Sequence, residues 1–394
     1  MRDGSLDQVL AARLDELERA GLCRTLPAMQ RCAGAEVVFQ GHPSVDFSSN
    51  DYLGLARDPR VAQAAISAVS VAGTGAGAAR LISGNHPFHE ALESALACLK
   101  RTEAALLFTS GWLANVGTIP ALVGRGDAVY ADALNHASLI DGCRLSRAEV
   151  RVFPHKDMVA LGALLSDDCG RFQRRLIVVD GVFSMDGDLF PLDELVRLAR
   201  QHDAWTYVDD AHGTGVLGSE GGGVAEHFGV QHEVDVLMGT LGKAFGTAGA
   251  FVAGSRTLIE YLRNRARSFI FTTAGPPALA AATLAALQIA VAEPWRRARV
   301  RAHTRRLADM LTGLGCPGRG GTDVPVVPII LGDAAEATRI ADALLHFGFL
   351  VGAIRPPTVP PGTARLRITL SAIHTTEQVD ALAEALAGLL VLRD

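Results

Sequence analysis

The chain has 394 residues, of which 49% are hydrophobic and 20% charged, and its formal net charge is −5. This composition predicts a soluble globular protein with one large domain and a smaller one. The slightly acidic balance argues against a nucleic-acid surface, and no uncharged apolar run reaches the roughly 18 residues of a membrane span. We therefore expect neither nucleic acid nor membrane among the partners.

The N-terminal segment is amphipathic and contains Asp and Glu, which is not the pattern of a signal or transit peptide. The six cysteines form no C-x-x-C pair, so we expect free thiols in a cytoplasmic protein. They are Cys23, Cys32, Cys98, Cys143, Cys169 and Cys316.

In chain order, the first predicted element is a helix over residues 5–21, with Leu6, Val9, Leu10, Leu14 and Leu17 on one stripe. From about residue 103, short apolar runs alternate with helical stretches such as 112–123 and 191–203. Short apolar strands separated by helices predict an α/β fold with a mostly parallel sheet covered on both faces. The expected strands are 104–108, 128–132, 149–153, 175–181, 205–210 and 234–239.

The pattern changes after an apolar helix expected at 277–291. An arginine-rich helix at about 294–314 leads to the apolar run 324–331, and the rest of the chain mixes helices with strands. We interpret this part as a smaller α+β C-terminal domain. The predicted division is an N-terminal helix and arm (1–45), a large domain (46–290) and a small domain (291–394). The elements expected in the last part are helix 335–347, strand 365–372 and a final helix from Thr375.

Polar residues gather where the predicted strands end, which is where ligands bind in open α/β sheets. "LFTSGW" places Ser110 and Gly111 between a strand and a helix, a junction whose free N–H groups bind anions. A plain helix N-cap by Ser110 explains the same letters. His136 follows another strand, and a loop histidine is often merely structural.

Two further strand ends carry acidic residues, and these could also be read as metal ligands. A metal hydrolase, however, leaves Lys243 without a role. The metal-capable residues are Asp186, Asp188, Asp209, Asp210 and His212.

Lys243 is the only basic residue of the glycine-rich stretch 235–254. Burial among small apolar residues lowers the pKa of a lysine and suits it to Schiff-base formation, and the glycines would let a ligand approach the backbone. Pyridoxal 5'-phosphate (PLP) needs such a lysine, a carboxylate for its pyridine nitrogen and a phosphate cradle. Asp209 fits the carboxylate. Candidates for the phosphate are Gly111, Trp112, Thr240 and either Thr272 or Thr273.

Seven segments in this order resemble the α-oxoamine synthases, which are PLP-dependent transferases of fold type I, the aspartate-aminotransferase type. The resemblance extends from about residue 5 to 390. The segments are "SSNDYLGL", "LFTSGWLAN", "NHASLIDG", "DGVFSMDGD", "VDDAHGTGVLG", "GTLGKAFG" and "RPPTVPPGTARLRITLSA".

The resemblance implies a role for each matching residue. Lys243 carries the cofactor and acts as base, Asp209 pairs with the pyridinium, and His212 bonds the ring hydroxyl oxygen. His136 stacks on the ring, contacts substrate and has a catalytic role, either at the acyl oxygen or in a proton transfer. Ser184 also contacts the cofactor. Gly111, Trp112 and Thr240 bind at or near the phosphate. Arg24, Thr358 and Arg367 bind substrate, with Arg367 on its carboxylate.

The C-terminal segment most resembles the member of the family that works in biotin synthesis. It implies condensation of L-alanine with pimeloyl-CoA or pimeloyl-acyl carrier protein. Other members, which use glycine or serine, share the same lysine, aspartate and histidine. An aminotransferase or a non-catalytic subunit is less consistent with these residues. The resemblance also implies a homodimer with active sites at the interface, where 269–277 would reach the partner's phosphate.

Two departures from the family pattern stand out. Trp112 replaces the Phe or Tyr of many relatives, which matters little if only its amide is used. Ala76, Ala78 and Ala79 stand where several relatives have Gly or Ser, in a G-x-G segment that lacks the preceding strand of a dinucleotide site.

Overall fold

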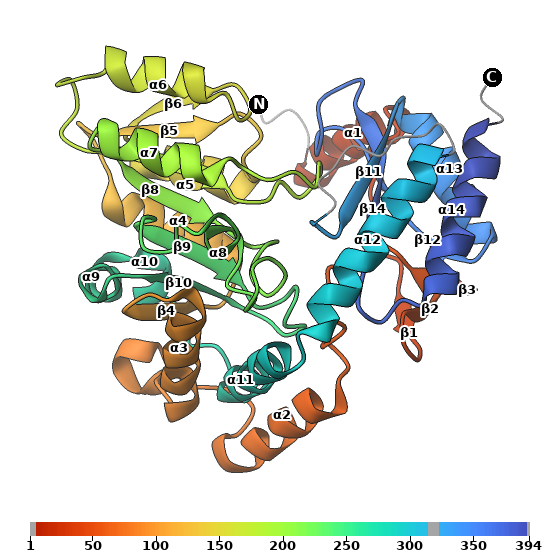
Figure 1. Ribbon diagram of the computed structural model, residues 1–394, viewed down its shortest axis with the longest axis horizontal. Coiled ribbons are helices and arrows are strands. Elements are labelled where there is room, and N and C mark those ends of the chain that lie inside the picture. The colour runs from red at the N-terminus through yellow and green to blue at the C-terminus, as the bar shows by residue number, and fades with distance from the viewer. Residues whose placement is uncertain (1–4, 314–322, 392–394) are drawn as a thin grey trace.

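The computed structural model describes residues 5–313 and 323–391. A seven-stranded sheet forms the centre of the large part of the molecule, in the order β4-β10-β9-β8-β7-β5-β6 (Figure 1). The strands from β9 to β6 pair in parallel, and β10 runs antiparallel to both β4 and β9. The bounds are β4 Ala104–Phe108, β5 Ala128–Asp132, β6 Glu149–Phe153, β7 Arg175–Asp180, β8 Trp205–Asp209, β9 Val236–Thr240 and β10 Ala250–Gly254.

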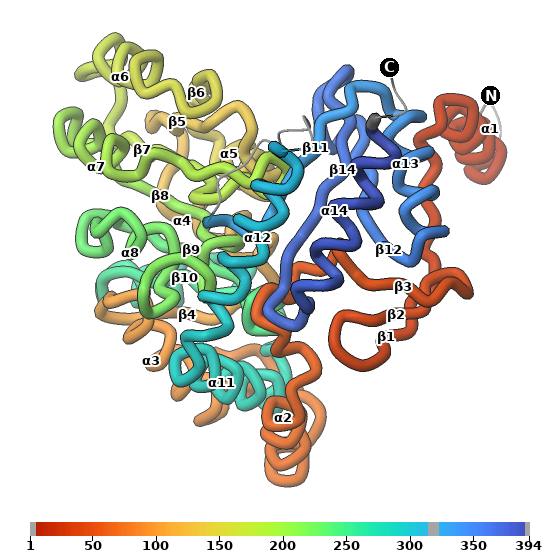
Figure 2. Tube along the Cα trace, turned by 45° about the vertical axis from the view of Figure 1, so that its right-hand side comes forward, coloured from red at the N-terminus to blue at the C-terminus, as the bar shows by residue number. Residues whose placement is uncertain are grey.

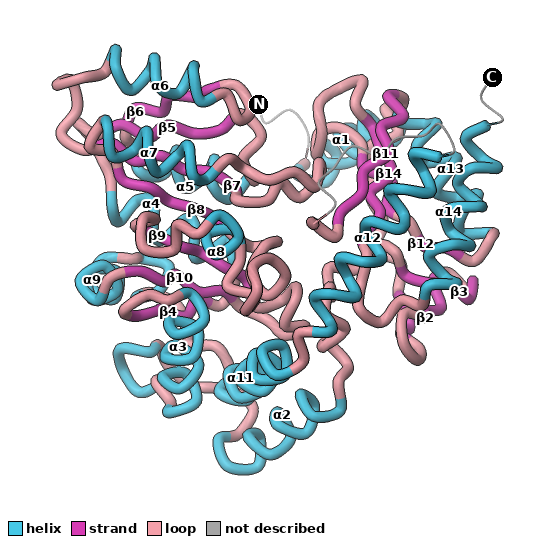
Figure 3. The backbone as a smooth tube through the Cα atoms, in the orientation of Figure 1, coloured by secondary structure: helices cyan, strands magenta, loops and turns pink. Residues whose placement is uncertain are grey.

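Alternation along each strand sends apolar side chains to both faces of this sheet. Leu176 and Val178 of β7 join one core, whereas Ile177 and Val179 join the other, and all four are fully buried. Helices cover both faces (Figures 1 and 3). One core includes side chains of α3 Pro87–Lys100, α6 Met158–Asp167, α7 Leu192–Gln201 and α8 Val224–Phe228, and the other those of α4 Gly111–Leu122, α5 Ala137–Ser146, α9 Arg256–Arg265 and α10 Arg267–Ile270.

Helix α11 (Pro277–Ala292) packs against α2 (Pro59–Ala72) and α3. It then bends by 73° into α12 (Trp295–Gly313), which leads toward the C-terminal part (Figure 1). In the described part of the chain, no single helix is long and apolar enough to cross a membrane. Together, α11 and α12 have the length and composition of a membrane span, but the pair is sharply bent. More than half of α11 is buried inside the protein, as the apolar segment predicted.

The C-terminal part is built on a sheet of order β11-β14-β13, and a second sheet of order β1-β2-β3-β12 joins the N-terminal arm to it (Figure 2). Strand β3 pairs in parallel with β12, so residues 42–46 belong structurally with this part of the molecule. The proposed domain limits stay a prediction. The bounds are β1 Met29–Arg31, β2 Glu36–Phe39, β3 His42–Asp46, β11 Val326–Gly332, β12 Phe349–Leu350, β13 Gly352–Ile354, β14 Ala364–Thr369, α13 Ala334–His346 and α14 Thr376–Val391, with a π-helical turn at Arg80–Gly84.

The expected strands of the central sheet form where the apolar runs predicted them, within about two residues at each end. Strand β10 and the N-terminal sheet were not predicted. Helix α1 (Leu6–Arg19) begins with a capping box at Ser5, but none of its residues is buried in the single chain. The five described cysteines are free, and Cys316 lies outside the described residues.

Candidate active site

The carboxyl ends of the central strands form one polar edge of the sheet. Asp180 ends β7 and Asp209 ends β8, and the two residues are paired in register. Thr240 ends the next strand, β9, and Lys243 follows it in a loop. Parallel strands bring their ends together, so the residues predicted from separate segments meet here.

Asp209 is buried and held by donors from two elements. Its Oδ2 accepts a 2.8 Å hydrogen bond from Asn115 Nδ2, and its Oδ1 accepts one of 3.0 Å from the amide of Ala211. The Asn115 Oδ1 accepts in turn from the hydroxyl of Tyr207 at 2.7 Å. The orientation of this carboxylate is therefore set by buried polar groups before any ligand binds.

The chain contains only three lysines, and their surroundings differ. Lys100 is fully buried and ion-paired with Asp210 at 2.6 Å, and Lys156 is paired with Asp188. The amine of Lys243 has no hydrogen-bond or ion-pair partner among the described residues. Desolvation lowers the pKa of Lys243, and the negative charge of Asp209 only partly opposes this effect. Lys243 is thus the lysine placed to react as a neutral amine.

His212 and His136 lie near this amine, and besides burial its positive charge lowers the pKa of both imidazoles. Burial, followed by the positive charges of Lys243 and Arg367, holds the pKa of His212 well below its usual range. His136 begins α5 and faces the edge of the Trp112 ring, with 6.4 Å between the ring centroids. Desolvation by the surrounding protein also lowers the pKa of His136, although the charge of Asp209 opposes it. Both imidazoles are neutral near pH 7.

The first turn of α4 lies beside Thr240. Ser110 caps the helix by accepting from the amide of Leu113 at 3.2 Å, as the structural interpretation predicted. The amides of Gly111 and Trp112 find no acceptor within the described ranges 5–313 and 323–391. A Cβ on Gly111 would lie 2.9 Å from the methyl group of Thr240, which places the two residues in contact. Capping and anion binding are therefore compatible here.

The two candidate threonines of the segment 269–277 lie near this turn. Thr272 and Thr273 line one cavity together with Thr109, which precedes α4. Threonines from two segments thus line the same space. No hydrogen bond fixes either of the two threonine hydroxyls within the part of the chain that the structure describes.

Arg367 extends the site across to the C-terminal part of the molecule. It lies buried in β14, and its Nε donates to the carbonyl of Ser184 at 2.5 Å. Its Nη2 donates to Asn50 Oδ1 at 3.2 Å. Because the charge of Arg367 lowers the pKa values of Lys243 and His212, its guanidinium lies within electrostatic reach of both. The candidates Arg367 and Ser184 are thereby brought to the site.

Arg24 and Thr358 lie apart from these residues. The Arg24 guanidinium is 3.4 Å from the Thr358 hydroxyl, and both line a separate cavity with Arg355. No side-chain hydrogen bond links this pair to Lys243 or Arg367 in the described part of the chain.

The acidic residues weighed as metal ligands each have a partner of their own. Asp186 pairs with Arg365, Asp188 with His155 and Lys156, and Asp210 with Lys100. Within the described residues, no group of three or more His, Cys, Asp or Glu side chains could hold a metal ion.

Two glycines near Lys243, Gly239 and Gly246, differ from the expectation that the glycines make room for a ligand. A Cβ on Gly246 would lie 2.2 Å from the backbone nitrogen of Ala56, and one on Gly239 would lie 2.6 Å from the ring of Phe251. Gly246 also has a φ of +66°. These two glycines allow close packing of the protein against itself.

Three polar residues of the site were not predicted. Asn115 lies within an apolar helical stretch, and Asn50 and Tyr52 lie in "SSNDYLGL". Asn115 could have been noticed in the sequence, because a polar residue in an apolar helix is expected to be buried with hydrogen-bond partners. Only the tertiary contacts identify the other two.

The residues present fit PLP. A partly buried amine without a partner, a buried carboxylate and free amides at a helix N-terminus supply the three groups that this cofactor requires.

Comparison with known proteins agrees with this chemistry. The sequence pattern of aminotransferase class I and II matches residues 42–386. The structure resembles serine palmitoyltransferase of S. paucimobilis with bound PLP, with a TM-score of 0.92 and 31% identity over 99% of both chains. The chain therefore belongs to the aminotransferase class I and II family, and its cofactor is PLP.

Sequence identity defines the group within that family. An 8-amino-7-oxononanoate synthase of Alkalilimnicola ehrlichii is 51% identical over 392 residues, which cover 99% of this chain and 100% of that protein. The structure of the Francisella tularensis 8-amino-7-oxononanoate synthase is 28% identical, with a TM-score of 0.77, and covers 89% of this chain and 98% of that one. The chain is an enzyme, a PLP-dependent acyltransferase of the 8-amino-7-oxononanoate synthase group, as its motifs predicted.

Proposed function

We propose that this enzyme condenses L-alanine with a pimeloyl thioester to give 8-amino-7-oxononanoate, carbon dioxide and a free thiol, a reaction of biotin synthesis. The support is twofold: the 51% identity to a protein of that name, and the unpartnered amine of Lys243 beside the buried carboxylate of Asp209. The backbone resemblance to serine palmitoyltransferase does not discriminate, because members of one family share a fold but differ in substrate.

Each residue has a defined task in this proposal. Arg367 binds the alanine carboxylate, because a guanidinium offers two parallel N–H donors. Lys243, neutral once released from the cofactor, takes the proton from Cα and later returns one to the product. PLP, when bound, accepts the electron pair left behind when a bond to Cα breaks. Asp209 holds the pyridine nitrogen protonated, and His212 bonds the ring hydroxyl oxygen.

The remaining predicted residues bind rather than transfer protons. The amides of Gly111 and Trp112, with the Thr240 hydroxyl, hold the phosphate, and Ser184 contacts the cofactor. His136 stacks on the ring and contacts the acyl substrate. We propose that Arg24 and Thr358, with their shared cavity, bind the far end of that substrate.

Substrate assays test the proposal. L-Alanine, glycine and L-serine are each combined with acetyl-, succinyl-, pimeloyl- and palmitoyl-CoA, and released thiol and product mass are measured. We expect turnover with alanine and the pimeloyl thioester, and turnover with only glycine or serine would refute the assignment. A comparison of pimeloyl-CoA with pimeloyl-acyl carrier protein then identifies the acyl carrier.

We also propose a homodimer in the cytoplasm. The apolar stripe of α1 and residues such as Ile82 and Phe271 are exposed in the single chain, as a dimer interface requires. Free thiols at the five described cysteines are consistent with a reducing compartment. Sedimentation equilibrium measures the assembly, and a monomer at working concentration would refute the dimer.

A further inference from the structure

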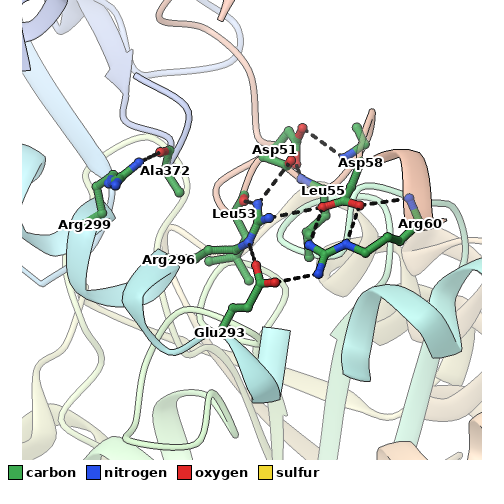
Figure 4. Close-up of polar contacts among 11 residues, drawn as sticks. Asp51, Leu53, Leu55, Asp58, Arg60, Glu293, Arg296, Arg299 and Ala372 are labelled. Carbon is green, nitrogen blue, oxygen red and sulfur yellow. Dashed lines mark hydrogen bonds and ion pairs between the residues drawn. The ribbon is translucent and has the colours of Figure 1, made fainter. Parts of the chain in front are cut away.

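The segment between β3 and α2, residues 47–58, crosses the site and is held on both sides. The amides of Thr369 and Ala372 donate to the carbonyls of Phe47 and Tyr52, both at 2.8 Å. On the other side, Arg296 at the start of α12 donates to the carbonyl of Leu53 at 2.7 Å (Figure 4). The backbone at Tyr52 is therefore fixed by both parts of the molecule.

Arg296 itself belongs to a larger polar cluster in Figure 4. Its Nη2 is 3.1 Å from Asp58 Oδ2, and its Nε is 2.8 Å from Glu293 Oε2. Arg60 joins the same two carboxylates, at 2.8 Å and 2.6 Å. Because Arg296 and Asp58 are buried, these contacts anchor the far end of the 47–58 segment firmly.

The side chain of Tyr52 connects two residues of the site. It is fully buried, and its hydroxyl lies 2.7 Å from His212 Nδ1 and 3.2 Å from Asn50 Oδ1. The same Asn50 oxygen accepts from Arg367 Nη2 at 3.2 Å. A continuous path of hydrogen bonds thus runs from Arg367 through Asn50 and Tyr52 to His212.

The direction of these hydrogen bonds follows from counting protons. Burial raises the pKa of Tyr52, so its hydroxyl keeps its single proton. Tyr52 donates this proton to Asn50 Oδ1 at 3.2 Å, and the same Asn50 oxygen accepts from Arg367 Nη2. The Tyr52 oxygen is therefore the acceptor of the 2.7 Å contact, and His212 Nδ1 donates to it.

We propose that Tyr52 is a positioning residue that fixes His212 in the tautomer with its proton on Nδ1. A neutral imidazole that donates at Nδ1 has an unprotonated Nε2, which can only accept a hydrogen bond. Nε2 has no hydrogen-bond partner among the residues that the structure describes, so its lone pair is available to the cofactor hydroxyl group. This use of the lone pair rests on the proposed function, whereas the tautomer itself does not.

Nitrogen NMR of the holoenzyme tests the tautomer directly. The protein is labelled with ¹⁵N-histidine, and the His212 signals are identified by their loss in His212→Gln. We expect a protonated Nδ1 and an unprotonated Nε2 in the wild-type enzyme. The opposite assignment in the wild-type enzyme would overturn the proposal. This measurement does not depend on whether the Tyr52→Phe variant folds. In Tyr52→Phe we expect the signals to move toward a mixture of tautomers, and unchanged signals would also overturn it.

Kinetics and absorbance give a second test with a matched control. In Tyr52→Phe we expect kcat to fall about tenfold, the effect of one buried hydrogen bond, with KM for alanine changed less than about twofold. The visible absorbance of the bound cofactor should change its dependence on pH. Tyr130→Phe removes an equally buried hydroxyl, bonded to Asp168 at 3.0 Å, and should change none of these.

The two tests separate this inference from the proposed reaction. Failure of the alanine condensation with a correct tautomer would refute the function alone. Equal effects of Tyr52→Phe and Tyr130→Phe on kcat and absorbance would refute the role of Tyr52.

Discussion

Asn115 Nδ2 donates a 2.8 Å hydrogen bond to Asp209 Oδ2, which joins α4 to the end of β8 in the buried centre of the site. The same amide nitrogen donates to Ser138 Oγ at 2.8 Å, and so α5 is joined as well. One asparagine therefore orients the carboxylate that pairs with the pyridine nitrogen in the proposed function.

Replacing Asp209 by alanine is expected to lower kcat on the order of a hundredfold or more, because a preorganised charge facing the reacting group is lost. The variant should also lose PLP on dialysis. Asn115→Ala keeps the charge but loses one donor, so a smaller loss of about tenfold is expected. Cofactor content is measured by absorbance. Asp193→Asn, on the exposed side of α7, serves as control, and full activity of Asp209→Ala would exclude the assigned role.

Lys243→Ala is expected to abolish both turnover and the visible absorbance of the covalently held cofactor. Reduction of the wild-type enzyme with borohydride should label one peptide, and that peptide should contain Lys243. Lys156→Ala is the control, because the Lys156 amine is partly exposed and already paired with Asp188. A coloured, active Lys243→Ala enzyme would be incompatible with the proposal.

Lys100 and Asp210 form a fully buried ion pair next to Asp209 in sequence, and Lys100 also donates to Thr214 Oγ1 at 2.7 Å and the carbonyl of Gly222 at 2.8 Å. Lys100→Met leaves the Asp210 carboxylate uncompensated, so the free energy of unfolding should fall by about 3–5 kcal/mol. Lys100→Met combined with Asp210→Asn should lose less. Urea unfolding measures both, and equal losses would show that the buried charge is not the cause.

His155 bridges Asp132 and Asp188 with contacts of 3.0 Å to each. Burial disfavours its protonation, but the hydrogen bonds to the two carboxylates outweigh this and raise the pKa of His155 to about 9. A pKa raised in the folded state stabilises fully below the unfolded value of about 6.5, and this contribution is lost as pH rises through about 9.

We therefore expect the free energy of unfolding to fall on the order of 2 kcal/mol between pH 6.5 and about 9.5, after allowance for partial exposure. His155→Gln should remove most of this dependence, with Lys156 left to hold Asp188. Urea unfolding at several pH values provides the measurement. If wild-type and variant lose stability in parallel, another group titrates.

The sequence predicted the central sheet well because the signal is local. The apolar run 176–179 has the length and the β-branched composition of a buried strand, and the charged residues Arg175 and Asp180 flank it. Strand β10 was not predicted, because Ala250–Gly254 lies in a glycine-rich stretch where no turn residues mark off a separate apolar run. Its antiparallel pairing depends on partners in β4 that are more than 100 residues away and on partners in β9 that are 10 to 18 residues away.

The sequence by itself determined the class of chemistry. One lysine among glycines, an aspartate at a strand end and an ordered set of motifs sufficed to predict PLP and the α-oxoamine synthase family. Only the tertiary structure decided which residues support them: Asn115 under Asp209, and Tyr52 against His212. It also explains why residue 246 is glycine: a Cβ there would lie 2.2 Å from the backbone nitrogen of Ala56. Single residues carry the chemistry, whereas the supporting contacts join segments up to 190 residues apart, from Ala56 to Gly246, and no local pattern encodes them.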